Sequence, residues 1–316
     1  MFDCHYDLLT YIYINRYNLK KVKKHCRKIF TNNITGGIFN LFYMSEIEME
    51  KELGIKKEEI DLIKNLETVN KLIKENNIIP KEIKYVYGIE GLDYLEKLDD
   101  INRIYNLGVR AVNIVWNNDN KFGGGAKGDE NRGLTEKGEE LVKKLVNTNI
   151  AIDLSHANEK TFYDIIKICK NLKKEGKKPR VFASHSNCKR VCNHQRNLSD
   201  EQILKIKELN GIIGIVEVKP FCIEEERINN HKQKYEKAYM EHIKHIRKLL
   251  GGVENIAIAT DDMTYYKTNK RYYKHFNVFK QSMIKEKLEQ LLLKNGFIIE
   301  ETEKILHKNA EEFFEI

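Results

Sequence analysis

Six residues that can bind metal or carry protons stand out because each comes at or near the end of a short apolar run. They are His5, Asp7, Glu90, His156, His185 and Asp261, in the runs FDCHYD, IKYVYGIE, IAIDLSH, RVFASHS and NIAIATDD. Imidazole and carboxylate groups are the usual zinc ligands in sites that keep one coordination position open. This set exceeds what one catalytic zinc needs and suits two metal ions that share a bridging carboxylate. Such a pair would hydrolyse an amide or an ester, with Asp261 as the spare carboxylate that carries a proton.

Taken one at a time, these residues have ordinary structural explanations. A histidine at the end of a strand often satisfies a backbone carbonyl, and Glu90 could be the acid that a helix dipole favours in its first turn. Asp261 could cap a helix or a turn. Alternate residues of a strand face the same side, so His5 and Asp7 would point the same way. The metal hypothesis therefore depends on whether the fold brings the six residues together.

The elements that would position them alternate regularly along the chain. Near-continuous apolar runs are typical of strands buried on both faces, and we count eight: FDCHYD, GGIFNLFY, IKYVYGIE, VRAVNIVW, IAIDLSH, RVFASHS, GIIGIVEV and NIAIATDD. Helical periodicity predicts helices at 19–29, 58–75, 92–106, 136–147, 159–174, 200–209, 236–250, 281–294 and 300–314. This alternation predicts an α/β fold, a (β/α)8 TIM-like barrel that forms one domain over residues 1–316. The carboxyl ends of all strands would share one rim, where barrel enzymes carry out their chemistry.

Composition limits the other possibilities. The chain has 55 Lys+Arg against 47 Asp+Glu, a net charge of +8, but the excess is spread along the sequence. The densest basic run, LKKVKKHCRKIF, reads as an amphipathic helix with a solvated outer face. We therefore expect no nucleic-acid partner. No apolar run approaches a membrane span and none follows a basic start, so neither membrane insertion nor a secretory leader is expected.

The cysteines and the remaining histidines complete this picture. The six cysteines are scattered without a CxxC motif, which is typical of reduced thiols and favours a cytoplasmic location. The other histidines lie on helical or charged stretches and are expected at the surface; they are His25, His194, His231, His242, His245, His275 and His307.

Over nearly its whole length the chain resembles the membrane dipeptidase family, also called renal dipeptidases, and in particular its bacterial members. DCHYDLL resembles the DxHxD start of the family and YGIEG its glutamate motif. The closest stretches are LGVRAVNIVWNNDN and RGLTEKGEELVKKLVNTNIAIDLSH, followed by FASHSN and RNLSDEQI. The resemblance implies a metal-dependent hydrolase barrel that acts as a zinc dipeptidase. Its substrates would be dipeptides with a free C-terminal carboxylate, attacked by a hydroxide that bridges the metals.

The resemblance also implies individual roles. Two Zn²⁺ ions, or other divalent metals, would be held by His5, Asp7, Glu90, His156 and His185, with Glu90 bridging both. Arg196 would bind the carboxylate of the substrate through its two-pronged guanidinium. Asp261 would carry the proton to the leaving amine. A small peptide is the expected partner, and a homodimer is compatible with the sequence.

The chain departs from the family pattern at three places. Trp116 stands where the mammalian members have a histidine thought to contact the substrate carbonyl, and we expect Trp116 and Asn117 to line the substrate site, with the indole N–H as a substitute donor. The strand that carries Asp261 has lost both glycines of the family motif. The segment 263–276, rich in Tyr and Lys, is expected to cover the mouth of the barrel as a recognition lid.

These departures leave two alternatives open. The chain could be another metal-dependent hydrolase of the same barrel type that cleaves an amide, a lactone or an ester. It could also bind a peptide without turnover, although such a barrel has no need to keep costly metal ligands together.

Overall fold

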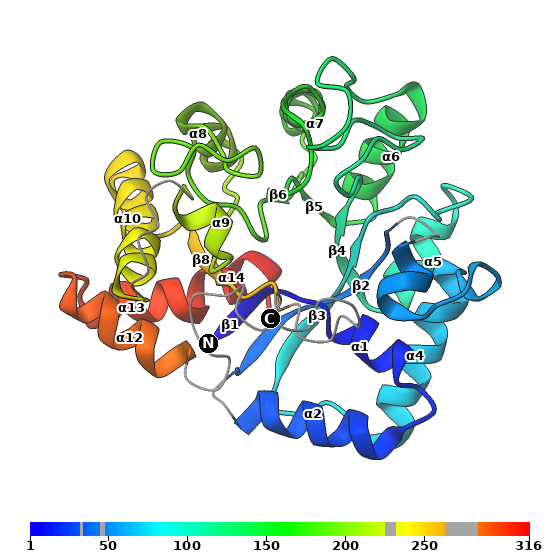
Figure 1. Ribbon diagram of the computed structural model, residues 1–316. Coiled ribbons are helices and arrows are strands. Elements are labelled where there is room, and N and C mark those ends of the chain that lie inside the picture. Colours follow the sequence, from blue (N-terminus) through cyan, green and yellow to red (C-terminus); the bar gives the residue numbers. More distant parts are fainter. Residues whose placement is uncertain (32–33, 45–47, 225–231, 263–283) are drawn as a thin grey trace.

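The computed structural model describes residues 1–31, 34–44, 48–224, 232–262 and 284–316. Its centre is one sheet of eight parallel strands in the order β6-β5-β4-β3-β2-β1-β8-β7, with helices around it (Figure 1). The strands are β1 (Phe2–Tyr6), β2 (Gly36–Phe42), β3 (Lys84–Glu90), β4 (Val109–Asn113), β5 (Ala151–Asp153), β6 (Val181–Phe182), β7 (Ile213–Val216) and β8 (Ile256–Ala259). All eight fall within the predicted runs. A parallel bridge between Ala183 and Ile213 brings the two edge strands together, so the predicted (β/α)8 barrel is confirmed.

Gly214 permits the edge strands to close. Its N–H donates to the Ala183 carbonyl at 2.7 Å, and a Cβ at this position would lie 1.8 Å from the Ser184 carbonyl oxygen. We expect Gly214→Ala to lower the free energy of unfolding by about 3 kcal/mol, because the strands would have to separate. Urea unfolding would measure this. Gly176→Ala is the control: its φ is +81° with nothing within 4 Å, so backbone strain alone should cost about 1 kcal/mol. Equal losses would show that closure does not depend on Gly214.

The helices agree with the sequence pattern where their apolar period is strong. The described helices are α1 (Leu8–Ile14), α2 (Leu19–Thr31), α4 (Leu62–Asn76), α5 (Asp100–Asn106), α6 (Glu136–Asn147), α7 (Glu159–Lys174), α8 (Asp200–Glu208), α9 (Lys219–Cys222), α10 (Lys232–Leu250), α12 (Ile284–Lys294), α13 (Ile299–Glu303) and α14 (Asn309–Phe314), with shorter turns η1 (Met49–Leu53), η2 (Lys57–Glu59) and η5 (Lys304–Lys308). The sequence pattern missed α1, η1 and α9. The predicted helix 92–106 is wrong in its first half: residues 92–99 form separate turns, with Leu95 N–H donating to Leu92 O and Asp100 N–H to Lys97 O, and α5 begins only at Asp100.

The amino-terminal end of the barrel is closed by aromatic side chains. The ring of Phe314, from α14, lies 6.3 Å from that of Phe2 and 5.5 Å from that of Phe182. Small residues such as Ala111 and Ala257 fill the adjoining interior. Because this end is packed, the open end is the rim formed by the carboxyl ends of the strands, where the candidate residues stand.

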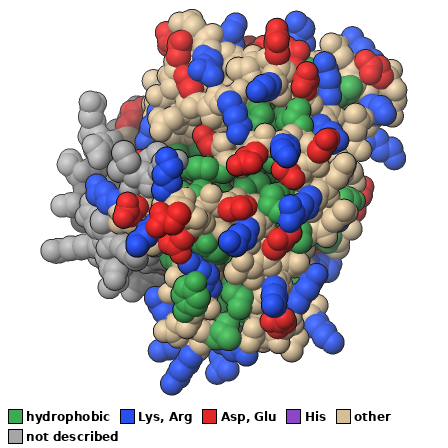
Figure 2. Space-filling view, turned by 90° about the vertical axis from the view of Figure 1, so that its right-hand side faces the viewer, with side chains coloured by type: hydrophobic (Ala, Val, Ile, Leu, Met, Phe, Trp, Pro, Cys, Tyr) green, Lys and Arg blue, Asp and Glu red, His purple; other side chains and the backbone are tan. Residues whose placement is uncertain are grey.

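The surface offers no helix that could cross a bilayer: among the described residues, none is both long and apolar enough. On the face shown in Figure 2, cationic and anionic side chains are interspersed over most of the area.

Candidate active site

The structure brings the six candidate residues together at the carboxyl rim. His5 and Glu90 belong to β1 and β3, Asp7 follows β1, and the other three follow β5, β6 and β8. All six side chains are buried. His156 and Asp261 have left-handed backbone conformations, with φ of 72° and 47°. Non-glycine residues adopt this region at a cost and cluster at functional sites, so both positions are held by their surroundings.

The carboxylate of Glu90 lies between the three histidines. Its Oε1 is 2.8 Å from Nε2 of His156 and 3.5 Å from Nε2 of His185. Its Oε2 is 3.3 Å from Nε2 of His5, and that same nitrogen is 3.6 Å from Oδ1 of Asp7. The two oxygens therefore face two different groups of side chains. A carboxylate that bridges two metal ions presents its oxygens in this way.

These side chains form three overlapping groups that could each hold a metal ion: His5, Asp153 and His185; Glu90, His156 and His185; and His5, Asp7 and Asp261. The second and third groups together contain every ligand expected from the sequence, while Asp153 and Asp261 come in addition. Nε2 of His5 is buried and makes no hydrogen bond with any residue that the structure describes. Imidazole nitrogens and carboxylates suit Zn²⁺ and similar divalent ions, so the donor set fits a two-metal centre.

The electrostatics of the cluster couple these groups. Burial alone would lower the pKa of His5, but the charges of Glu90 and Asp7 raise it to about 10. Burial opposes ionisation of Glu90, yet the positive charge of the neighbouring His5 holds its pKa well below the usual range. Burial and the nearby Arg196 lower the pKa of His156 to about 3, which keeps its ring neutral. A neutral imidazole is the form that can ligate a metal.

One neighbour of His156 fixes which nitrogen faces the centre. Its Nδ1 lies 2.9 Å from Oδ1 of Asn117, which is an acceptor. Nδ1 therefore carries the proton, and the lone pair on Nε2 points toward Glu90 and His185. Asn117 was expected to line the substrate site. It also bonds to His156, which is a candidate metal ligand.

A cavity of about 530 Å³ opens above the cluster and contains the residues expected to meet the substrate. It is lined by Asp7, Glu90, His156 and Asp261, by Arg196, Trp116 and Asn117, and by apolar side chains that include Phe42, Met44 and Phe221. The ring of Trp116 lies edge-on to Phe42 at 5.1 Å and 5.9 Å from the ring of His156. Trp116 therefore forms an apolar wall beside the metal ligands.

Arg196 and Asp261 are buried charged side chains of this cavity that are not among the expected ligands; Glu48, Lys51, Glu52 and Lys127 also line it but are not buried. Burial lowers the pKa of Arg196 to about 10, although the charge of Glu90 opposes this, so the guanidinium stays cationic at neutral pH. Its Nε is buried and makes no hydrogen bond within the described part of the chain. Burial raises the pKa of Asp261 to about 6.

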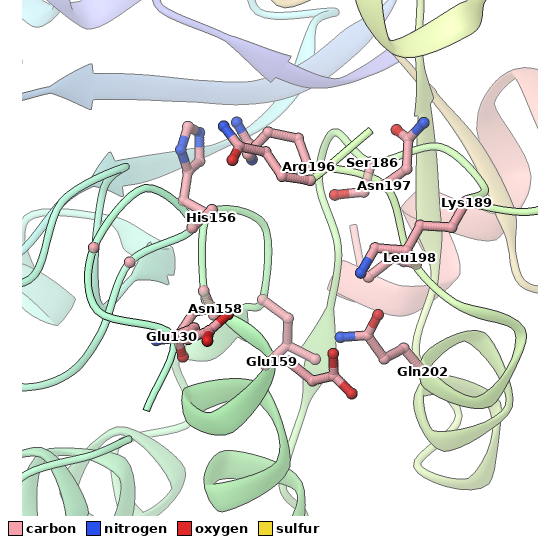
Figure 3. A pocket seen from close by; sticks show the side chains of 16 residues that line it. Glu130, His156, Asn158, Glu159, Ser186, Lys189, Arg196, Asn197, Leu198 and Gln202 are labelled. Carbon is pink, nitrogen blue, oxygen red and sulfur yellow. The ribbon is translucent and has the colours of Figure 1, made fainter. Parts of the chain in front are cut away.

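A second cavity of about 250 Å³ lies beyond Arg196 (Figure 3). His156 and Arg196 stand at one end, and Glu130, Glu159 and Gln202 at the other. Arg196 thus separates a chamber above the metal ligands from a smaller polar chamber.

Two buried aspartates were not recognised from the sequence. Oδ1 of Asp3 accepts from the N–H of His5 at 3.1 Å and of Thr260 at 2.9 Å. Oδ1 of Asp153 accepts from the N–H of Ser155 at 3.0 Å and of Ser184 at 2.9 Å. Each carboxylate ties the end of its own strand to the end of a neighbouring strand. A carboxylate inside an apolar run, as in FDCHYD and IAIDLSH, is the signal that could have revealed them.

The expectation that the other histidines lie at the surface is wrong for His242. Its ring is buried, with Nδ1 accepting from the N–H of Cys188 at 3.1 Å and Nε2 donating to the carbonyl of Cys222 at 3.0 Å. His194 lines the larger cavity. The segment 263–276, expected as a lid, lies outside the described residues, as do His231 and His275.

Comparisons with known proteins point in the same direction. A family model described as membrane dipeptidase (peptidase family M19) matches residues 1–312. An "uncharacterized protein in PQQ-III 3′ region" of Acinetobacter calcoaceticus is 29% identical over 206 residues, 60% of each chain. An "uncharacterized dipeptidase" of Schizosaccharomyces pombe is 28% identical over 189 residues, 58% of this chain and 43% of its own. The matches thus span 60% or less of these relatives.

A solved structure shares the fold. A metallopeptidase of Rhodobacter sphaeroides, bound to a phosphinate mimic of the dipeptide L-Ala-D-Ala, superposes with a TM-score of 0.75. It is 20% identical, and the match covers 99% of this chain and 98% of that one.

Proposed function

The chain belongs to the membrane dipeptidase family, and from this premise we propose that it is a zinc-dependent dipeptidase. It would hydrolyse the peptide bond of dipeptides that have a free C-terminal carboxylate. The observation that supports this most directly is the position of Glu90, whose two oxygens face two different sets of candidate ligands. A cationic, buried Arg196 in the adjoining cavity supports the preference for a carboxylate.

The candidate site residues would have three separate roles in the reaction: metal binding, substrate binding and proton transfer. Two divalent ions held by His5, Asp7, Glu90, His156 and His185 would supply Lewis acidity toward water and the scissile carbonyl. Arg196 would bind the substrate carboxylate through its planar guanidinium and so set the position of the peptide bond. Asp261 would accept a proton from the attacking water and give it to the nitrogen of the leaving amine.

The cavity wall suggests where a side chain of the substrate would lie. Phe42, Met44 and Trp116 contribute apolar surface to the cavity that Asp7 and Glu90 also line, and Phe42 pairs with Glu90 in the sheet. An apolar side chain on the N-terminal residue of the dipeptide would be desolvated there. Because a similar structure binds a mimic of L-Ala-D-Ala, both stereochemistries of the C-terminal residue belong in the test.

The experiment combines metal analysis with a substrate panel on the same sample. We expect two zinc ions per chain and hydrolysis of L,L or L,D dipeptides. The same dipeptides with an amidated C-terminus should be cleaved about 10²-fold less efficiently in kcat/KM, since the buried charge of Arg196 would have no partner. In Arg196→Met the free and amidated dipeptides should be cleaved with equal kcat/KM.

Fewer than one zinc per chain and no hydrolysis with added zinc would reject the proposal. Cleavage of a lactone or an N-acyl compound instead of dipeptides would favour a different hydrolase.

A further inference from the structure

His5 and His185, which would ligate different metal ions through Nε2, both have Nδ1 close to the hydroxyl group of Ser184. Oγ of Ser184 lies 3.2 Å from Nδ1 of His5 and 2.6 Å from Nδ1 of His185. His5 faces Oε2 of Glu90, and His185 faces Oε1. All three side chains are buried, so water does not compete for these contacts. We infer that Ser184 is a positioning residue that orients one ligand of each metal ion at the same time.

The hydrogen-bonding capacity of a serine hydroxyl fits this role. A metal ligated through Nε2 requires a lone pair there, so the proton of each neutral ring must be on Nδ1. The two lone pairs of Oγ can accept both Nδ1–H groups, provided that its own proton points elsewhere. A hydrogen bond from the Ser184 side chain to the carboxylate of Asp153 supplies that acceptor.

The backbone holds Ser184 in this place. Its N–H donates to Oδ1 of Asp153 at 2.9 Å, which fixes the end of β6 to the end of β5. The N–H of the next residue, His185, donates to Oγ of Ser155 at 3.1 Å. Nδ2 of Asn40 lies 3.0 Å from Nδ1 of His5, but an amide NH2 group donates and cannot accept the Nδ1–H, so Ser184 is the acceptor that the described residues offer there. His185 has Ser184 as the only partner of its Nδ1 that we find among the described residues.

This arrangement predicts that Ser184→Ala weakens both metal sites. Loss of such a partner typically lowers metal affinity by about 10–100-fold. We expect a loss of that size both at the site of His156 and His185 and at the site of His5, because the Nδ2 group of Asn40 is a donor and cannot accept the Nδ1–H of His5 in place of Ser184. The measurement is a titration of the metal-free full chain with Co²⁺ or Zn²⁺ in competition with a chelator, which resolves the two binding steps.

Two matched variants make the result specific. Asn117→Ala removes the partner of His156 and should weaken one step only, which identifies that step. Ser186→Ala makes the same change two residues further on. Oγ of Ser186 donates a hydrogen bond to Ser155 and is not bonded to either histidine within the described part of the chain, so both steps should stay unchanged. Thermal unfolding of each metal-free variant checks that it is folded.

The inference rests on the proposed two-metal dipeptidase, but the two can fail separately. A chain that binds two metals in the predicted way and cleaves no dipeptide would reject the function alone. An active dipeptidase in which Ser184→Ala weakens one step or neither would overturn the role of Ser184. Wild-type protein that binds fewer than two metal ions would overturn it as well.

Discussion

Replacing Glu90 by glutamine is expected to lower the zinc content from two ions per chain to one or none, and to reduce dipeptide hydrolysis at least about 10³-fold. The change keeps the size of the side chain and replaces one oxygen with an NH2 group that cannot ligate a metal. Oε1 and Oε2 face different histidines, so either orientation of the amide removes a ligand from one of the two metal sites. A metal ion that polarises a carbonyl contributes several kcal/mol to the transition state, which sets the size of the effect.

Metal analysis and kinetics on the same preparation would measure both outcomes. Glu217→Gln is the matched control, because Glu217 is also a buried carboxylate that follows a barrel strand but is absent from the candidate metal groups. It should retain two zinc ions and its activity. An undiminished zinc content in Glu90→Gln would contradict the bridging position.

Much of this site was predictable because barrel topology converts sequence position into spatial position. In a parallel barrel every carboxyl end reaches the same rim, so locating Glu90 and His185 at the ends of apolar runs was enough to bring them together. All eight strands were also predictable. Strands buried on both faces are apolar at nearly every position, so each one appears in the sequence as a near-continuous apolar run.

The parts that were missed depend on contacts between distant segments. The segment from Leu92 is not helical before Asp100; it stays beside the end of β4, where Leu92 N–H bonds to Ile114 O, a tertiary contact that local period cannot reveal. The role of Ser184 likewise appears only when β1 and β6 are placed around one centre, since 179 positions separate it from His5. His242 was misjudged because a histidine on an amphipathic helix looks the same whether its face is solvated or packed.

Position alone does not separate the residues that would hold metal from those that would bind substrate. Asp7, Glu90, Arg196 and Asp261 all line the larger cavity, and Nη2 of Arg196 lies 2.9 Å from Nε2 of His185. Asp261 could act in either way, because it is also within reach of His5 and Asp7 as a metal ligand. A substitution that removes its charge while keeping its shape distinguishes the two roles.

Asp261→Asn is therefore expected to retain both zinc ions and to lose about 10²–10⁴-fold in kcat, the usual contribution of a positioned general acid or base. KM should change little, because Arg196 still binds the carboxylate of the substrate. Asp262→Asn, the same change at the next residue, should keep both the zinc content and kcat near the wild-type values. If Asp261→Asn instead loses a zinc ion, Asp261 is a ligand. The proton would then have to be carried by another group, and the backbone strain at Asp261, with its φ of 47°, would serve metal binding instead of proton transfer.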